Sequence, residues 1–135
     1  MNKQIKITII WSFIGLGLGM HSLLEQSEAI FFKPLLEEPI SAGIPPFAHV
    51  IYILAMIFPM IMAFLHLFYT KKGFLIFSMV YAGLLSILNI FHVIETLMVN
   101  IGNISQIILL LFVAIANIAL IFLLNKYKKE VILPN

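Results

Sequence analysis

The chain has 135 residues, of which 62% are apolar and only 10% are charged, and its formal net charge is +2. Soluble domains have about 45–50% apolar and about 25% charged residues, so this composition excludes an ordinary soluble fold and indicates a membrane protein. The absence of cysteine excludes disulfides, thiolate metal sites and a cysteine nucleophile. The lysines form no soluble basic face, so nucleic acid is not an expected partner.

Four long apolar segments predict four transmembrane helices. About 20 residues cross a hydrocarbon layer about 30 Å thick, and each segment reaches that length. Backbone groups in lipid must be paired within their own segment, so we expect each span to be helical. The spans are expected at about residues 5–30, 47–69, 74–99 and 104–125 of a single transmembrane domain, residues 1–135.

The first span begins after Lys3 and Lys6, a start that is also typical of a signal peptide. The apolar run is long and no A-x-A cleavage pattern follows it, so we favour a membrane span. Within it, Gly15 and Gly19 form a G-x-x-x-G motif that permits close approach of another helix, and Gly17 adds a further small position.

The segment between the first two spans, Lys33 to Pro46, holds four of the six prolines and cannot continue a helix. The next two connections, near residues 70–73 and 100–103, are short, which predicts antiparallel neighbouring helices. Pro59 lies inside the second span and should bend it, because proline has no N–H to donate.

The lysines predict the orientation. Seven of the eight lysines fall on one side of the predicted spans and only Lys33 falls on the other, so the lysine-rich side is expected to be cytoplasmic. The predicted fold is therefore an all-α, integral membrane, antiparallel four-helix bundle with both termini cytoplasmic, a multi-pass protein of the cell's inner (plasma) membrane.

Ionisable residues from three spans fall near one depth, close to the outer surface: His21, Glu25, Glu28, His49, His92 and Glu95. With a rise of 1.5 Å per residue, the three histidines lie about 22–33 Å from the cytoplasmic lysines. Spacings of i, i+4, i+7 in the first span and i, i+3 in the third put each group on one helical face, and Asn89 extends the second group inward. Gln106 falls at the same height on the fourth span. If these faces point to the bundle axis, they meet in one polar pocket.

Imidazoles and carboxylates are ligands of Zn²⁺, Fe and Mn. The expected metal ligands are His21, Glu25, His49 and His92. Glu95 and Glu28 are the candidate catalytic residues, either orienting the ligands or acting as a general base. The sequence thus predicts a small membrane protein that binds a divalent metal and acts on a lipid-soluble or periplasmic substrate.

Other interpretations of the same residues remain open. His49 and His92 could ligate haem b in an electron carrier, and Glu25 could titrate in a proton-coupled small transporter. The chain could be an accessory subunit of a larger membrane complex or a homo-oligomer, with membrane lipid as its other partner. Glu28 and Glu95 could also simply reach lipid headgroups, with His21 and Glu25 forming one buried pair.

Two further polar residues are expected to have structural roles. His66 lies near the cytoplasmic surface, and no polar group of another span is expected at its depth, which favours an interfacial histidine. Asn117 lies in the middle of the fourth span and is expected to donate a hydrogen bond to a neighbouring helix.

Overall fold

The structure is a computed structural model that describes residues 2–32, 46–99 and 101–132. Residues 1, 33–45, 100 and 133–135 lie outside the described part, as do the side chains of residues 26–32, 46, 48 and 132. The predicted proline-rich connection therefore falls outside the described residues apart from Pro46. Every regular element in the described part is helical, as the composition predicted.

Four helices of the described residues are long and apolar enough to cross a membrane, so the prediction of four spans is confirmed at this level. The first is α1 (Lys3–Phe32), the third is α4 (Lys72–Val99) and the fourth is α5 (Ile104–Ile132). The second is divided. It consists of α2 (Pro46–Tyr52), a π-helical turn η1 (Ile53–Ile57) and α3 (Phe58–His66), which continue one another along the chain.

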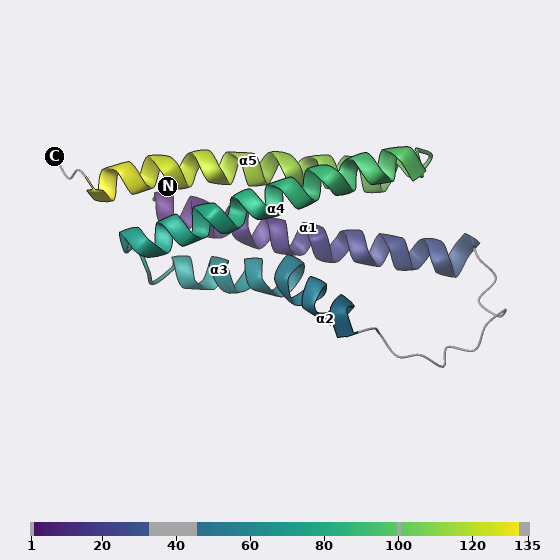
Figure 1. The fold of residues 1–135 in the computed structure, drawn as a ribbon, viewed down its shortest axis with the longest axis horizontal. Coiled ribbons are helices and arrows are strands. Elements are labelled where there is room, and N and C mark those ends of the chain that lie inside the picture. Colours follow the sequence, from purple (N-terminus) through teal and green to yellow (C-terminus); the bar gives the residue numbers. More distant parts are fainter. Residues whose placement is uncertain (1, 33–45, 100, 133–135) are drawn as a thin grey trace.

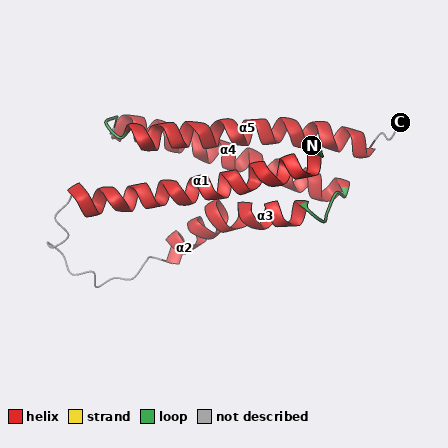
Figure 2. Ribbon diagram, turned by 180° about the vertical axis from the view of Figure 1, so that it is seen from behind, coloured by secondary structure: helices red, strands yellow, loops and turns green. Residues whose placement is uncertain are grey.

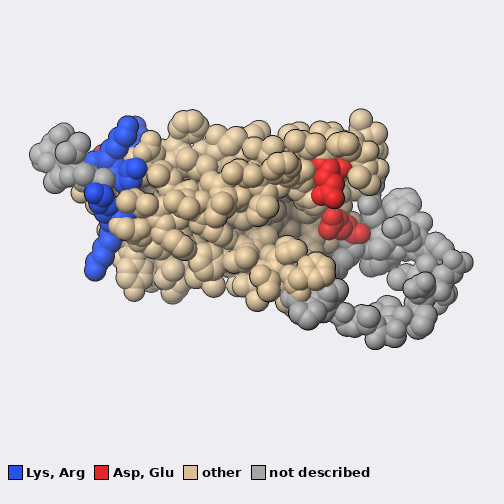
Figure 3. All heavy atoms as spheres, viewed as in Figure 1, with Lys and Arg blue, Asp and Glu red and all other residues tan. Residues whose placement is uncertain are grey.

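The helices lie lengthwise beside one another (Figures 1 and 2). The start of α1, the turn between α3 and α4 and the end of α5 lie at one end of the molecule (Figure 1). Lysine side chains gather at this end, whereas most of the glutamates that the structure describes lie towards the opposite end (Figure 3). At the lysine end, Lys3 forms an ion pair with Glu130, which joins the beginning of α1 to the end of α5.

The break in the second span is the local consequence of Pro59. The N–H of Phe58 bonds to the carbonyl of Ile53, five residues back, instead of that of Leu54. A continued π turn would offer Leu54 the N–H of residue 59, but proline has none. The hydroxyl of Tyr81, on α4, donates to the Leu54 carbonyl instead. Helix α4 therefore supplies the hydrogen bond that the backbone of the second span lacks.

The core near the lysine end contains a polar network inside an apolar cluster. Trp11 and His66 are both completely buried, and Ser78 lies between them. The Trp11 Nε1–H donates to Ser78 Oγ at 3.2 Å, and His66 Nε2 lies 2.8 Å from the same oxygen. The expectation that no polar group of another span lies near His66 is wrong, because Ser78 of α4 contacts both His66 and Trp11 of α1.

Asn117 is likewise completely buried in α5. Its Nδ2 donates to the Val113 carbonyl of its own helix at 3.2 Å. The amide N–H₂ therefore bonds within α5 and does not form the predicted hydrogen bond to a neighbouring helix.

Two glycines of α1 set how closely other helices approach it. A Cβ added at Gly15 would lie 2.8 Å from Met60 Cγ and 3.1 Å from the Met56 carbonyl oxygen, and one added at Gly17 would lie 2.6 Å from Val113 Cγ2. A Cβ at Gly19 would meet nothing within 4 Å. The close contacts are thus made by Gly15 and Gly17, on two sides of α1, rather than by the G-x-x-x-G pair.

We expect Gly15→Ala to lower the free energy of unfolding by about 1–3 kcal/mol, because the new methyl group must displace a neighbouring backbone carbonyl. Gly19→Ala is the matched control, since its methyl group meets open space and alanine favours helix by up to about 1 kcal/mol. Equilibrium unfolding in mixed detergent micelles measures both. Equal effects of the two substitutions would contradict the close packing at Gly15.

Candidate metal centre

His21 is placed by the buried stripe of α1. Apolar side chains at Ile7, Trp11, Ile14 and Leu18 are all buried, and the alternating steps of four and three residues continue to His21, which is only 5% exposed. A stripe of this spacing occupies one face of a helix. His21 therefore continues the packing face of α1 and points into the molecule, not at its surface.

His92 approaches the same point from α4. Its ring and that of His21 meet nearly edge to face, with centroids 4.7 Å apart and an interplanar angle of 80°. The two Nε2 atoms face one another at 2.6 Å. The Thr96 hydroxyl donates to the His92 backbone carbonyl at 2.9 Å, within the last turns of α4.

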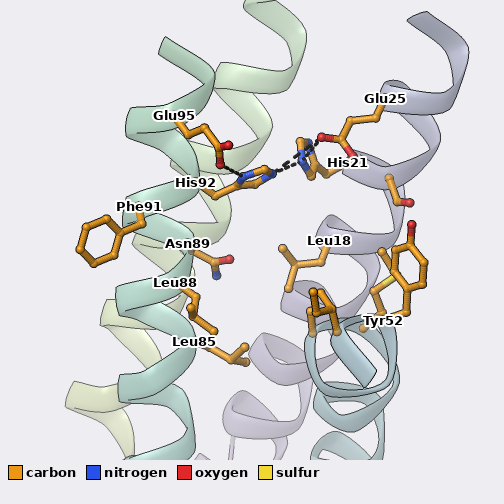
Figure 4. A pocket seen from close by; sticks show the side chains of 14 residues that line it. Leu18, His21, Glu25, Tyr52, Leu85, Leu88, Asn89, Phe91, His92 and Glu95 are labelled. Atoms are coloured by element: carbon orange, nitrogen blue, oxygen red, sulfur yellow. Dashed lines mark hydrogen bonds and ion pairs between the residues drawn. The ribbon is translucent and has the colours of Figure 1, made fainter. Parts of the chain in front are cut away.

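Two carboxylates flank the imidazole pair (Figure 4). Glu25, one turn beyond His21, places Oε1 3.4 Å from His21 Nε2 and 3.9 Å from His92 Nε2. Glu95, one turn beyond His92, places Oε2 3.3 Å from His92 Nδ1, on the far side of the ring. Glu25 thus faces the space between the imidazoles, whereas Glu95 contacts His92 at Nδ1, on the side of the ring away from His21.

Lone pairs of these side chains face one another in the space between the two rings. A hydrogen on Nδ1 lets His92 donate to Glu95, and the Nε2 lone pair then faces His21 and the carboxylate of Glu25. Either a hydrogen shared between the two Nε2 atoms or a metal ion bound by all three groups would stabilise two imidazole nitrogens and a carboxylate oxygen at these separations. His21, Glu25 and His92 form a group that can hold a metal ion.

The separations suit a small divalent ion. Zinc bonds nitrogen and oxygen at about 2.0–2.2 Å, so ligand atoms around a tetrahedral ion lie about 3.3 Å apart. The His21–Glu25 separation of 3.4 Å already matches this value. Side-chain rotations that change the other two separations by about 0.6–0.7 Å would bring all three atoms to it.

A cavity of about 460 Å³ extends from this group into the molecule. Its lining residues come from α1, α2, η1 and α4. The four ionisable side chains lie at one end, and Leu18, Leu85 and Leu88 lie deeper, with Asn89 between the two groups (Figure 4). A fourth metal ligand or a substrate atom can therefore reach the group from the cavity.

The structure brings together three of the four predicted ligands. His49 lies in α2, is exposed, and belongs neither to the group of possible ligands nor to the cavity lining among the described residues. The side chain of Glu28 lies outside the described residues. Gln106 is buried but does not line the cavity; its backbone N–H is capped by Asn103 at 3.2 Å.

Sequence reasoning missed two sets of polar contacts, the network of Trp11, Ser78 and His66 and the hydrogen bond from Tyr81. A signal for the first was present. His66 and Ser78 lie at equal sequence distances from Lys72, in the turn of a helical hairpin, and so share a depth.

No protein-family model matches the chain, and no curated protein or solved structure is significantly similar to it.

Proposed function

We propose that the chain is an integral membrane zinc protein whose site, near the outer surface of the plasma membrane, acts on a lipid-soluble substrate. The convergence of His21, Glu25 and His92 from two helices on one point is the observation that carries this proposal. Ionisable side chains within membrane spans are costly, and they usually face the interior and mark function. A bound cation offsets that cost by neutralising the carboxylate.

The orientation is part of the same proposal. Lysines gather at one end of the molecule (Figure 3), which supports a cytoplasmic location for that end. The helices then form an antiparallel bundle with both termini cytoplasmic, and His21 and His92 lie towards the outer leaflet. Membrane lipid is the nearest source of substrate at this depth.

Two histidines, one glutamate and an open position form a ligand set typical of catalytic zinc. Zinc in such a site acts as a Lewis acid towards a carbonyl oxygen. Glu95 accepts a hydrogen bond from His92 Nδ1, which fixes the ring with Nε2 towards the ion and raises its basicity. Glu25, whose side chain is half exposed, lines the cavity as well as facing the two imidazoles. The role of general base predicted for Glu95 or Glu28 stays a prediction.

A shared proton is the second candidate for the charge between the rings. The Nε2–Nε2 separation of 2.6 Å is that of a short hydrogen bond. With Glu25 on one side and Glu95 on the other, the pair would form a proton relay, as in the proton-coupled transporter that the sequence also allowed. The relay and the zinc site use the same atoms, so the two exclude one another at any moment.

Metal analysis of the full chain tests the proposal. The protein is purified in mild detergent without chelators, and its Zn, Fe, Mn and Cu contents are measured before and after dialysis against a zinc buffer. We expect about one zinc ion per chain after dialysis. No stoichiometric metal in either sample would leave the proton relay as the function. A visible absorption spectrum of the same sample tests the haem b prediction for His49 and His92.

A further inference from the structure

The cavity is amphipathic along its length. Its polar end holds the imidazoles and carboxylates described above, and its other end is lined by aliphatic side chains (Figure 4): Leu18, Leu85, Leu88, Ala55 and Met56. Its volume lies within the range of about 300–1,000 Å³ that is common for small-molecule sites. A cavity of this size can take an acyl chain.

Asn89 marks the boundary between the two ends. It lies one turn before His92, is 4% exposed and points into the cavity (Figure 4). Its Nδ2 has no hydrogen-bond partner among the described residues. A buried amide N–H₂ without an acceptor costs about 1–3 kcal/mol, so a rotation of the side chain that presents Nδ2 to an acceptor oxygen of a ligand in the cavity would be favourable.

The residues that line the cavity come from α1, α2, η1 and α4, and none comes from α3 or α5 among the described residues. The rims carry large exposed apolar side chains, Ile51 and Tyr52 on one side and Leu88 and Phe91 on the other. In a bilayer these side chains contact acyl chains, so a lipid-soluble ligand can reach the cavity from the membrane.

We infer that the cavity binds a single-chain amphiphile whose head carries a carbonyl oxygen. This inference names the substrate class of the proposed zinc site and rests on that proposal. The acyl chain lies along Leu18 and Leu85, Asn89 Nδ2 donates to one carbonyl oxygen, and the head lies against the ion held by His21 and His92. A free fatty acid and a monoacyl glycerophospholipid both carry this chemistry.

Photoactivatable probes test the inference in the full chain, reconstituted in bilayer nanodiscs. One arm uses a fatty acid and the other a monoacyl phosphatidylcholine, each with a diazirine near the chain end. We expect cross-links at Leu85 and Leu18, saturable by the unlabelled lipid. Probe that merely surrounds the protein should label exposed side chains of α5 such as Ile115 and Phe122, and this labelling should not saturate. The arm that saturates at lower concentration identifies the head group.

Asn89→Leu should weaken saturable binding about tenfold, because it removes one hydrogen bond to the carbonyl oxygen. The same substitution removes an unpartnered buried amide, so it should leave the protein equally or more resistant to unfolding. A purely structural asparagine would show the opposite. Ser86→Ala, at a buried hydroxyl of α4 outside the cavity lining, is the control and should bind the probe like the parent protein.

Two bulky substitutions close the apolar end. Ala55→Trp fills it from η1, and Leu88→Trp fills it from the exposed rim of α4, where a large side chain meets no packed neighbour. Either should abolish the saturable cross-links at Leu85. Cross-links that do not saturate, or that persist unchanged in Leu88→Trp and Asn89→Leu, would overturn the inference.

Zinc content, measured in the same samples, separates the two proposals. One zinc per chain without saturable labelling would mean that the metal site stands and the substrate class is wrong. Saturable labelling that is lost in Asn89→Leu but takes place without zinc would mean that the cavity binds the amphiphile and the metal proposal is wrong.

Discussion

Replacing His21 or His92 by alanine is expected to lower the zinc affinity of the purified protein by more than about 100-fold. Loss of a group that only orients a ligand costs about 10–100-fold in metal affinity, and loss of a direct ligand from a three-residue site costs more. Competition with a chromophoric chelator in detergent measures the affinity. The zinc affinity should also fall as the pH is lowered, because protons compete with the metal for the imidazole nitrogens and the carboxylate.

His49→Ala is the matched control, since His49 is exposed and lies outside the group of possible ligands among the described residues. We expect its zinc affinity to equal that of the parent protein. Glu95→Gln should lower the zinc affinity by about 10–100-fold, because the amide still orients His92 but lacks the negative charge of the carboxylate. A loss in His49→Ala as large as that in His21→Ala would show that α2 supplies a fourth ligand, as the sequence predicted.

The membrane spans were predictable because lipid imposes length and apolarity directly on the sequence. Depth was predictable for the same reason, since a fixed rise per residue places His21 and His92 in one layer. Their meeting in space was a hypothesis, which rested on the one-face spacings in the first and third spans and on both faces pointing to the bundle axis. The structure confirms the grouping of His21, Glu25 and His92 as residues that can hold a metal ion.

The rotation of each helix was harder to predict than its depth. A π turn takes up about one more residue than an α turn, which rotates the preceding residues by about 100° relative to α3. Pro59 predicted a bend, but nothing in the sequence specified the π turn at Ile53–Ile57. His49 precedes that turn and is exposed, although it shares the depth of the other histidines.

Neutral polar groups were the other source of error. No polar partner was expected for His66, whereas its partner is the hydroxyl of Ser78, which Trp11 also contacts. In lipid, hydroxyl and indole groups need partners as much as charged groups do, and they join helices through single hydrogen bonds. The glycine motif was similarly ambiguous, because a spacing of small residues identifies close packing without identifying the partner helix.

Trp11→Ala is expected to lower the free energy of unfolding by about 3–5 kcal/mol, the second large effect that the structure implies. Trp11 is completely buried, stacks on Tyr81 with ring centroids 5.5 Å apart, and donates to Ser78. Between membrane helices apolar burial against lipid gains little, so the loss arises from the cavity and its missing packing contacts. Unfolding in mixed detergent micelles, followed by helical circular dichroism, measures it.

The matched control is Phe122→Ala on α5, an aromatic side chain that is 71% exposed to the surroundings of the molecule. Its removal leaves no internal cavity, so the change should stay within about 0.5 kcal/mol. Trp11→Phe separates the two contributions, because it keeps most of the ring and removes the donor to Ser78, at an expected cost of about 1–3 kcal/mol. If Trp11→Ala and Phe122→Ala were equally harmful, Trp11 could not be packed against α4, and the buried stripe of α1 that includes His21 would face elsewhere.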